Sequence, residues 1–152
     1  LEIEKLKHEQ LITYSEKLYS LFNIIDDNNA SINTRLTAIS SLEPYLYGFK
    51  NDDFQKNAIE FFRNFLESLN IEKQVGEGVD LNELYSRKED HYWLFNKVVV
   101  VFSNGFKNNY FTKPFLNFNF SCFTFHSINF NVEFINCHFC HVSFNNCVTH
   151  LK

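Results

Sequence analysis

The chain of 152 residues is poor in residues that break regular structure. It contains four Gly and two Pro, and neither residue occurs between positions 118 and 149. Antiparallel hairpins normally place turn-forming residues such as these at each reversal, so their absence argues against a run of hairpins. Zinc ribbons and knuckles also fold their ligands around the ion with Gly-rich turns. This stretch therefore needs another explanation.

Long apolar runs and basic clusters are also scarce. The longest uninterrupted apolar run, residues 98–102, is far too short to cross a bilayer. Lys and Arg form no stripe of the kind that binds nucleic acid. The charged first residues do not resemble a secretory signal, and four Cys without such a signal are typical of reduced thiols. We expect a cytoplasmic protein that binds neither nucleic acid nor membrane.

Charge divides the sequence into two parts. Residues 1–95 carry 10 Lys and Arg against 17 Asp and Glu, whereas residues 96–152 carry four Lys and one acid, Glu133. The second part is instead rich in Phe and Asn. The difference predicts an α+β protein with a helical domain over residues 1–95 and a second domain over residues 96–152, whose first residues, to about 117, are an irregular lead-in.

Apolar spacing predicts three helices in the acidic part. Residues 1–25 have a stripe at helical spacing: Leu11, Tyr14, Leu18, Leu21 and Ile25. A second helix begins near Ser31 or Asn33, buries Leu36, Ile39 and Leu42, and stops at Pro44. A third begins behind Asp52 or Asp53 as its N-cap and buries Phe54, Ala58, Phe61, Phe65 and Leu69. The paired aspartates at 26–27 and 52–53 are interpreted as caps and turns rather than acid–base couples.

The connection between the two parts is expected to be less regular. Residues 75–80, "VGEGVD", lack the spacing of a phosphate-binding loop and are interpreted as a linker, with a short helix starting at Asp80. Glu89, Asp90 and His91 are expected in a solvated loop. The β-branched run "KVVVVF", residues 97–102, predicts a strand.

From Phe118 onward, pairs of apolar residues separated by one position recur every five residues, with a single four-residue step. An ordinary strand would continue its alternation instead of resetting after each pair. A fixed repeat with one inward pair per unit is typical of a solenoid. The second members of the pairs are Phe120, Phe125, Phe130, Phe134, Phe139, Phe144 and Thr149, and the first members are Phe118, Phe123, Ile128, Val132, Cys137, Val142 and Cys147.

This pattern resembles the pentapeptide-repeat family, over residues 118–151. Asn119 and Asn129 stand just before a central Phe, where that family favours Asp or Asn, and "NCHF" has its familiar form. The resemblance implies a right-handed, four-sided β-helix with one pentad on each side. "NTRLTAISSLE", residues 33–43, also resembles helices that precede such repeats in some bacterial proteins. The structural repeat core would comprise the paired residues from Phe118 to Cys147.

Four sides per turn, one of them a residue shorter, give a specific stacking prediction. Phe139 should lie on Phe120, and Phe144 on Phe125. The same winding places Thr149 on Phe130, Cys137 on Phe118 and Val142 on Phe123.

The Cys and His residues of this stretch allow a metal alternative. Cys137, Cys140, Cys147 and His150 have spacings that imitate a four-ligand zinc site. The repeat, however, turns Cys137 and Cys147 inward and Cys140 and His150 outward, so they could not share one ion. We therefore expect no metal and no cofactor. Cys140 with His141 could form a nucleophilic pair, but a flat outer face would offer it no pocket.

A solenoid with polar outer faces and no cleft favours contact with other proteins over catalysis. The function predicted is a non-enzymatic interaction or regulatory module whose helical part caps the solenoid. Its exposed end would allow a homodimer through the C-terminal coil. One alternative is a DNA-mimic inhibitor or protector of a type II topoisomerase, which some members of the family are. Another, of a different class, is a small zinc-binding protein.

Overall fold

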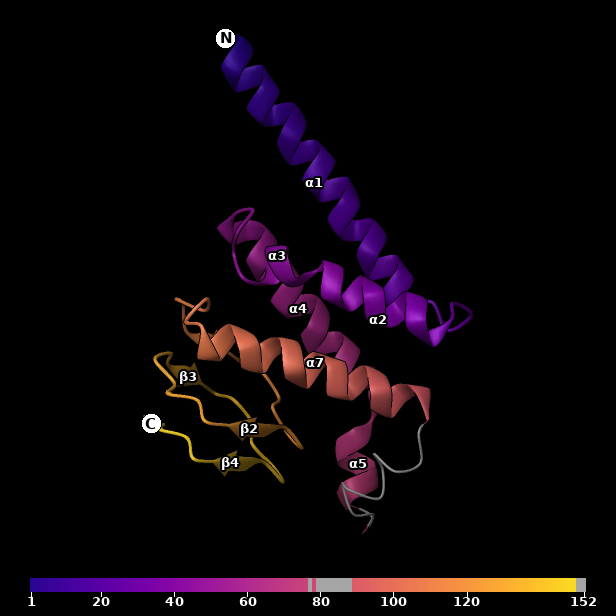
Figure 1. The fold of residues 1–152 in the computed structure, drawn as a ribbon, viewed down its shortest axis with the longest axis vertical. Coiled ribbons are helices and arrows are strands. Elements are labelled where there is room, and N and C mark those ends of the chain that lie inside the picture. The colour runs from indigo at the N-terminus through magenta and orange to yellow at the C-terminus, as the bar shows by residue number, and fades with distance from the viewer. Residues whose placement is uncertain (77, 79–88, 150–152) are drawn as a thin grey trace. The chain divides into compact units, whose positions relative to one another are not determined.

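The computed structural model describes residues 1–76, 78 and 89–149, in which helices precede short strands (Figure 1). This confirms the α+β class. The helices are α1 (Glu2–Asp26), α2 (Ile32–Ser41), α3 (Glu43–Leu46), α4 (Asp52–Leu69), α5 (Ile71–Gly76) and α7 (Asp90–Lys107). The strands are β1 (Phe115–Leu116), β2 (Thr124–His126), β3 (Phe134–Ile135) and β4 (Ser143–Asn145). Among the described residues, no helix has the length and apolarity needed to cross a membrane.

The chain forms two compact units that divide between Phe61 and Phe62, within α4. The boundary predicted at residues 95–96 falls instead inside α7. Val75 and Gly76, expected in a linker, end α5. The helix predicted to start at Asp80 lies outside the described residues.

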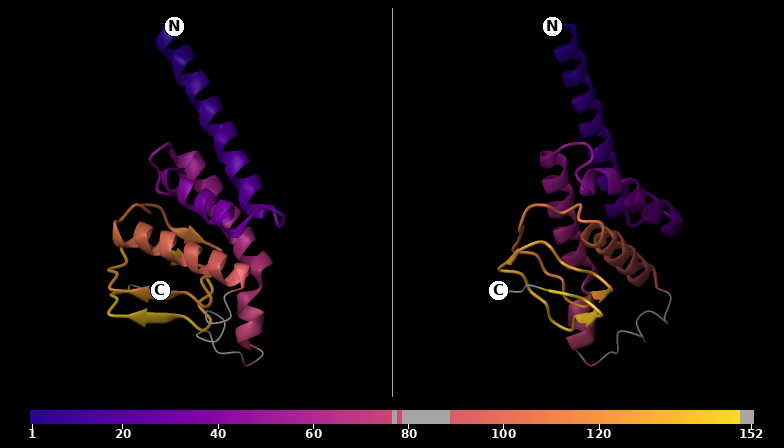
Figure 2. Two further views of the ribbon diagram at one scale, coloured as in Figure 1. Left: turned by 45° about the vertical axis from the view of Figure 1, so that its right-hand side comes forward. Right: turned by 60° about the vertical axis from the view of Figure 1, so that its left-hand side comes forward.

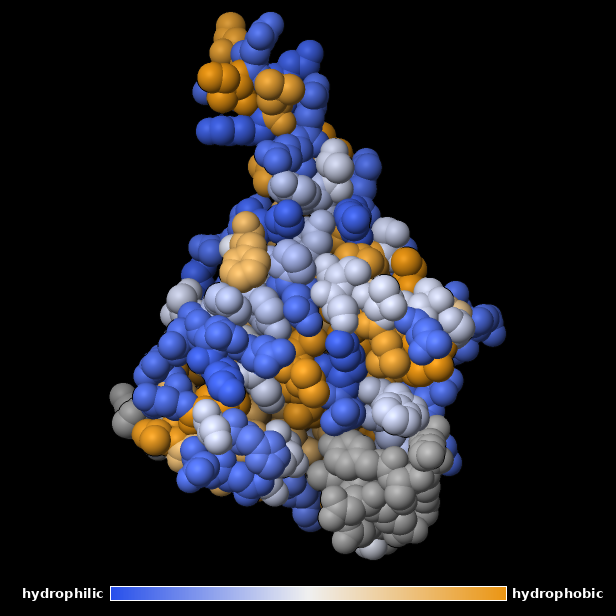
Figure 3. Space-filling view, in the orientation of Figure 1, coloured by the Kyte–Doolittle hydropathy of each residue, from blue (hydrophilic) through white to orange (hydrophobic). Residues whose placement is uncertain are grey.

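In the first unit, the amphipathic stripe of α1 is buried over only part of its length. Leu18, Leu21 and Ile25 are buried as predicted, whereas Leu11 is 43% exposed. Apolar side chains also stand among polar ones towards the start of the helix (Figure 3). The C-terminal half of α1 therefore provides the helix's contribution to the core.

Buried polar side chains satisfy the backbone where helices of this unit end. The Arg35 guanidinium donates from Nε to the carbonyl of Ile25 near the end of α1, at 2.7 Å. Gln55 Nε2 donates to the carbonyl of Leu46 at 2.9 Å, at the end of α3. The last carbonyls of a helix have no partner within it, so these contacts remove a cost of burying the helix ends.

Two helix boundaries differ from the predictions because of local capping. The Asn51 side chain, rather than that of Asp52 or Asp53, accepts a hydrogen bond from the Phe54 amide at 2.7 Å and caps α4. Both aspartates lie in the first turn, where the helix dipole favours negative charge. Pro44 does not end α2 but occupies the first turn of α3, where its missing N–H costs nothing.

The predicted strand at residues 97–102 is wrong, because these residues belong to α7. Asp90 and His91, expected in a loop, begin the same helix. Placing Val in a helix is less favourable than placing a better helix former by less than about 1 kcal/mol, so packing decides whether these residues form a helix or a strand. Buried residues recur along α7 at helical spacing: Phe95, Val98, Phe102 and Phe106. Residues 98–101 are all Val, so this run by itself does not show the helical spacing of the buried residues.

The C-terminal strand segment, residues 115–149, consists of parallel pairs with one constant offset in the sequence. Phe115 pairs with Phe134 and Phe125 with Phe144. Bridges between Asn119 and His138 and between Asn129 and Val148 continue the same offset. Phe115 thus belongs to a regular strand, and the predicted irregular lead-in to residue 117 ends before it.

The predicted ring stacking is confirmed. The Phe120 and Phe139 rings are stacked with centroids 5.4 Å apart, and those of Phe125 and Phe144 are stacked at 5.6 Å. Their interplanar angles are 15° and 22°. Residues 134–149 thus pair with residues 115–133 at the constant offset, and the two ranges are called the second turn and the first turn, respectively.

Helix α7 covers the end of the strand segment formed by the first turn (Figure 2). The ring of Phe106 lies 5.1–5.9 Å from the rings of four Phe residues that are spaced five apart in the first turn: Phe115, Phe120, Phe125 and Phe130. One ring thus contacts all four of these rings. Phe102 adds contacts with Phe118 and Phe123.

The two turns differ in burial. Central residues of the first turn are at most 3% exposed, as are Phe118, Phe123 and Ile128 beside them. In the second turn, Phe134 is buried at 9% exposure. The other inward positions are half-buried: Cys137, Phe139, Val142, Phe144, Cys147 and Thr149. The first turn is enclosed between α7 and the second turn, whereas the second has one apolar side uncovered.

Left-handed residues form most corners of the strand segment. Positive φ angles occur at Asn117, Cys122 and Ser127, and at the equivalent positions of the second turn, Asn136, His141 and Asn146. Asn tolerates this conformation better than most residues, which explains how the chain turns without Gly. Fixed corners every five residues restart the alternation and produce the pattern of apolar pairs.

Ser127 and Ser143 provide a matched test of these corners. Ser127 is an exposed corner residue with φ of 55°, whereas Ser143 is exposed within β4. We expect Ser127→Gly to raise the free energy of unfolding by about 0.5–1 kcal/mol, because glycine relieves the strain of positive φ. Ser143→Gly should lower it by a similar amount. Urea unfolding of both variants measures the difference, and equal losses would contradict the role assigned to the corner.

Candidate functional site

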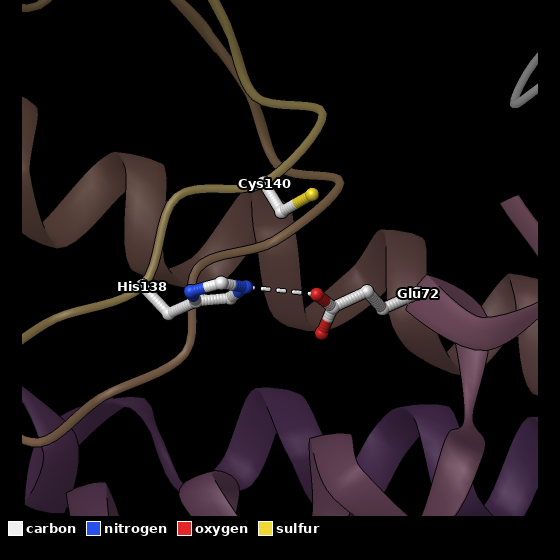
Figure 4. A group of neighbouring side chains, drawn as sticks. All are labelled: Glu72, His138 and Cys140. Atoms are coloured by element: carbon white, nitrogen blue, oxygen red, sulfur yellow. Dashed lines mark hydrogen bonds and ion pairs between the residues drawn. The ribbon is translucent and has the colours of Figure 1, made fainter. Parts of the chain in front are cut away.

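The candidate site lies in the second unit, where α5 meets the second turn of the strand segment. The carboxylate of Glu72 in α5 lies 2.9 Å from Nε2 of His138. Cys140 lies beside them, and its sulfur is within 4.8 Å of the nearest potential ligand atoms of both residues. Figure 4 shows the His138 imidazole and the Cys140 sulfur projecting from one backbone segment towards Glu72, with the imidazole joined to the carboxylate by a dashed line.

The repeat explains why His138 and Cys140 lie together. They flank Phe139, whose ring packs inward against Phe120. In extended chain, residues two apart point to the same face, so the neighbours of an inward ring both point outward. Helix α5 then supplies the acid from a distant part of the sequence.

Hydrogen bonds hold the Glu72 carboxylate in its charged form. Asn119 Nδ2 donates to Glu72 Oε2 at 2.8 Å, while His138 contacts the other oxygen. The Asn119 hydrogen bond is the main reason that the pKa of Glu72 is lowered, against an opposing effect of burial. Asn119 also pairs with His138 across the two turns, so the first turn supports the acid and the second turn contacts it.

A pocket of about 490 Å³ adjoins these residues. Acidic, basic and apolar side chains line it, including Glu72, Lys73, Phe95, Ser121, Cys140 and His141. The expectation that Cys140 and His141 would lie on a flat face without a pocket is therefore wrong. The Cys140 amide donates to Ser121 Oγ at 3.1 Å, which fixes the backbone at the pocket wall.

The predicted zinc ligands are separated within the described residues. Cys137 donates its S–H to the carbonyl of Phe115 at 3.4 Å, and Cys147 donates to that of Phe125 at 3.5 Å. These two thiols are occupied along the inner side of the repeat, whereas Cys140 belongs to the cluster with Glu72. His150 lies outside the described residues.

The histidines of the strand segment are exposed, whereas Cys122 is buried. His126, His138 and His141 are exposed, as predicted for outer positions. Cys122 is fully buried, and burial raises the pKa of its thiol to about 11. Burial also raises the pKa of Cys137. Cys122 is therefore suited to packing rather than to reaction at neutral pH.

Sequence reasoning missed Glu72 and the role of His138. Glu72 stands in a short helix of the acidic part of the chain, far from His138 in sequence, and no local motif marks it. The repeat predicts that His138 and Cys140 both point outward, but it gives no sign of the acid that lies beside them. Comparisons with family models, curated proteins and solved structures find no match for the chain.

Proposed function

We propose that the protein is a non-enzymatic interaction module built on a short pentapeptide-repeat β-helix. Helix α7 caps one end of this right-handed, four-sided β-helix. The uncovered second turn binds the same surface of another copy of the chain, so that the module forms a dimer. A larger regulatory role would depend on this pairing.

The repeat geometry supports the β-helix. Central residues from Phe115 to Thr149 follow steps of five, five, five and four residues before the cycle restarts. One such cycle leads from Phe115 to Phe134 and from Phe125 to Phe144, which are the residues that pair between strands. An up-and-down sheet would give antiparallel pairs with changing offsets, so the parallel pairs favour a continuous winding.

The half-burial of the second turn is the observation that carries the interaction. Phe139 and Phe144 are half-buried, although the rings on which they stack, Phe120 and Phe125, are at most 1% exposed. Covering the free side of these rings would remove apolar area from water, at about 25 cal/mol per Å². A stacked copy is the partner that repeats the environment already present on the other side.

Charge and backbone pairing also favour a second copy. Between residues 110 and 149, the only charged side chains apart from histidine are Lys113 and Glu133, so two copies approach with little repulsion. Among the described residues, β3 pairs only with β1, and β4 only with β2. The opposite edges of β3 and β4 can therefore pair with another chain.

Two valines provide the test. Val142 is a half-buried inward residue of the second turn, and Val148 is an outward residue that is 53% exposed. Light scattering during size-exclusion chromatography should give a dimer for the wild-type chain. We expect Val142→Asp to yield a monomer, because it places a charge in the apolar contact, and Val148→Asp to remain dimeric.

Folding must be measured alongside mass. Far-ultraviolet circular dichroism should show that the Val142→Asp monomer keeps its secondary structure. For the wild type, the unfolding temperature should rise with protein concentration, as linked association requires. A wild-type monomer at all concentrations would refute the pairing, as would loss of the dimer through Val148→Asp alone.

A further inference from the structure

Glu72, His138 and Cys140 bring together the three kinds of side chain that bind zinc in proteins. The carboxylate oxygen comes from α5, whereas the imidazole nitrogen and the thiol come from residues 138 and 140 of the second turn, and the nearest ligand atoms all lie within 4.8 Å of one another. The geometry points to a binding site for one Zn²⁺ ion, held by these three side chains and joining α5 to the second turn. This inference is independent of dimer formation.

The distances require only local adjustment. Zinc bond lengths of about 2.0 Å to nitrogen or oxygen and about 2.3 Å to sulfur imply ligand separations of roughly 3.3–3.6 Å in a tetrahedron. The His138–Glu72 separation of 2.9 Å is slightly shorter, and the other separations extend to at most 4.8 Å. The His138 and Glu72 side chains are 61% and 37% exposed, which leaves room for rotation.

The donor set selects the class of ion. Calcium and magnesium prefer all-oxygen sites, whereas a thiolate with an imidazole favours zinc and other borderline transition metals. Binding displaces the proton of the Cys140 thiol into solvent and uses an unprotonated nitrogen of His138. Three protein ligands leave a fourth position for water, at the edge of the pocket lined by Cys140 and His141.

A supporting layer of contacts is already present around the ligands. Asn119 Nδ2 donates to Glu72 Oε2, which leaves Oε1, the oxygen that faces His138, for the ion. Ser121 Oγ accepts from the Cys140 amide and fixes the strand behind the sulfur. Such second-layer contacts orient metal ligands and tune their affinity.

Titration of the full chain with Zn²⁺, and separately with Co²⁺, tests the site. The wild type should bind one equivalent of Zn²⁺, and the Co²⁺ form should show the charge-transfer absorption of a cobalt–thiolate bond. Cys140→Ser should abolish that absorption and weaken Zn²⁺ binding by more than about 100-fold, beyond the usual effect of a supporting residue. His138→Gln and Glu72→Gln should also weaken binding, while Asn119→Ala should weaken it about 10–100-fold.

Cys137→Ser and Cys147→Ser are the matched controls, because both thiols donate to backbone carbonyls away from the cluster. They should retain wild-type affinity and the cobalt absorption. Urea unfolding in the presence of chelator checks that each variant folds. If Cys140→Ser does not fold, His138→Gln and Glu72→Gln still test the site, because their side chains are more accessible. Absence of Zn²⁺ binding by the wild type would overturn the site, as would equal losses from all three cysteine variants.

Discussion

Replacement of Phe106 by alanine should lower the free energy of unfolding of the second unit by about 3–5 kcal/mol. The side chain is 3% exposed, and its ring contacts the rings of Phe115, Phe120, Phe125 and Phe130 in the first turn. Removing it leaves a cavity among these rings, which cannot move in to fill it without breaking the strand pairs around them. Urea unfolding followed by far-ultraviolet circular dichroism measures the loss.

Val100 supplies the control on the same helix. It is 43% exposed, so Val100→Ala changes α7 without opening the core. We expect its effect to stay within about 0.5 kcal/mol, since alanine is also the better helix former. Similar losses for the two variants would mean that α7 contributes through its own helical stability rather than by capping the strand segment.

Phe120→Ala and Phe139→Ala should differ strongly, although they remove the same ring from the same stack. Phe120 is fully buried between Phe106 and Phe139, and its loss should cost about 3–5 kcal/mol. Phe139 is half-buried, so its truncation removes less buried area and opens a space that the free end of the stack can fill. A cost of roughly half that of Phe120→Ala is expected.

Protein concentration separates this effect from dimer formation. At low concentration, the two phenylalanine variants should show the difference described above. At high concentration, a dimer would bury Phe139 and increase the cost of losing it, while the cost at Phe120 should change little. Equal costs at every concentration would show that the second turn is as enclosed as the first, contrary to its half-burial.

The strand segment could be predicted from sequence because its constraints are local and repeated. Each five-residue step brings back an apolar pair and a corner residue, so the constant offset between the two turns follows from spacing alone. The stacking of Phe139 on Phe120 needed no knowledge of the rest of the chain. The extension to Phe115 was missed because Pro114 and the residues before it do not show the inward pair.

Elements whose structure depends on distant packing were harder to predict. The run Val98–Phe102 favours a strand by propensity, but Phe102 and Phe106 must lie on one helical face to cover the first turn. Differences in helix propensity of a few tenths of a kcal/mol per residue are smaller than the free energy gained by burying these side chains. The Asn51 cap was missed for a smaller reason, since three adjacent polar residues could each occupy that position.

The candidate site combined a predictable part with an unpredictable one. The outward directions of His138 and Cys140 followed from the repeat. Glu72 comes from a different element, and its approach depends on how α5 packs beside Asn119. Spacing along the chain therefore points to Cys137 and Cys147, which imitate a metal site, and does not point to the acid that lies against His138.

Because α7 covers one end of the strand segment, the segment can change in length only at its other end. A tandem duplication of one full turn of sequence, placed after the second turn, would add another layer with the same corner residues. It would leave the contacts of Phe106 with the first turn unchanged. An insertion between α7 and β1 would instead separate Phe106 from the Phe rings that it contacts. Length can thus vary at one end of the stack while the other end preserves the fold.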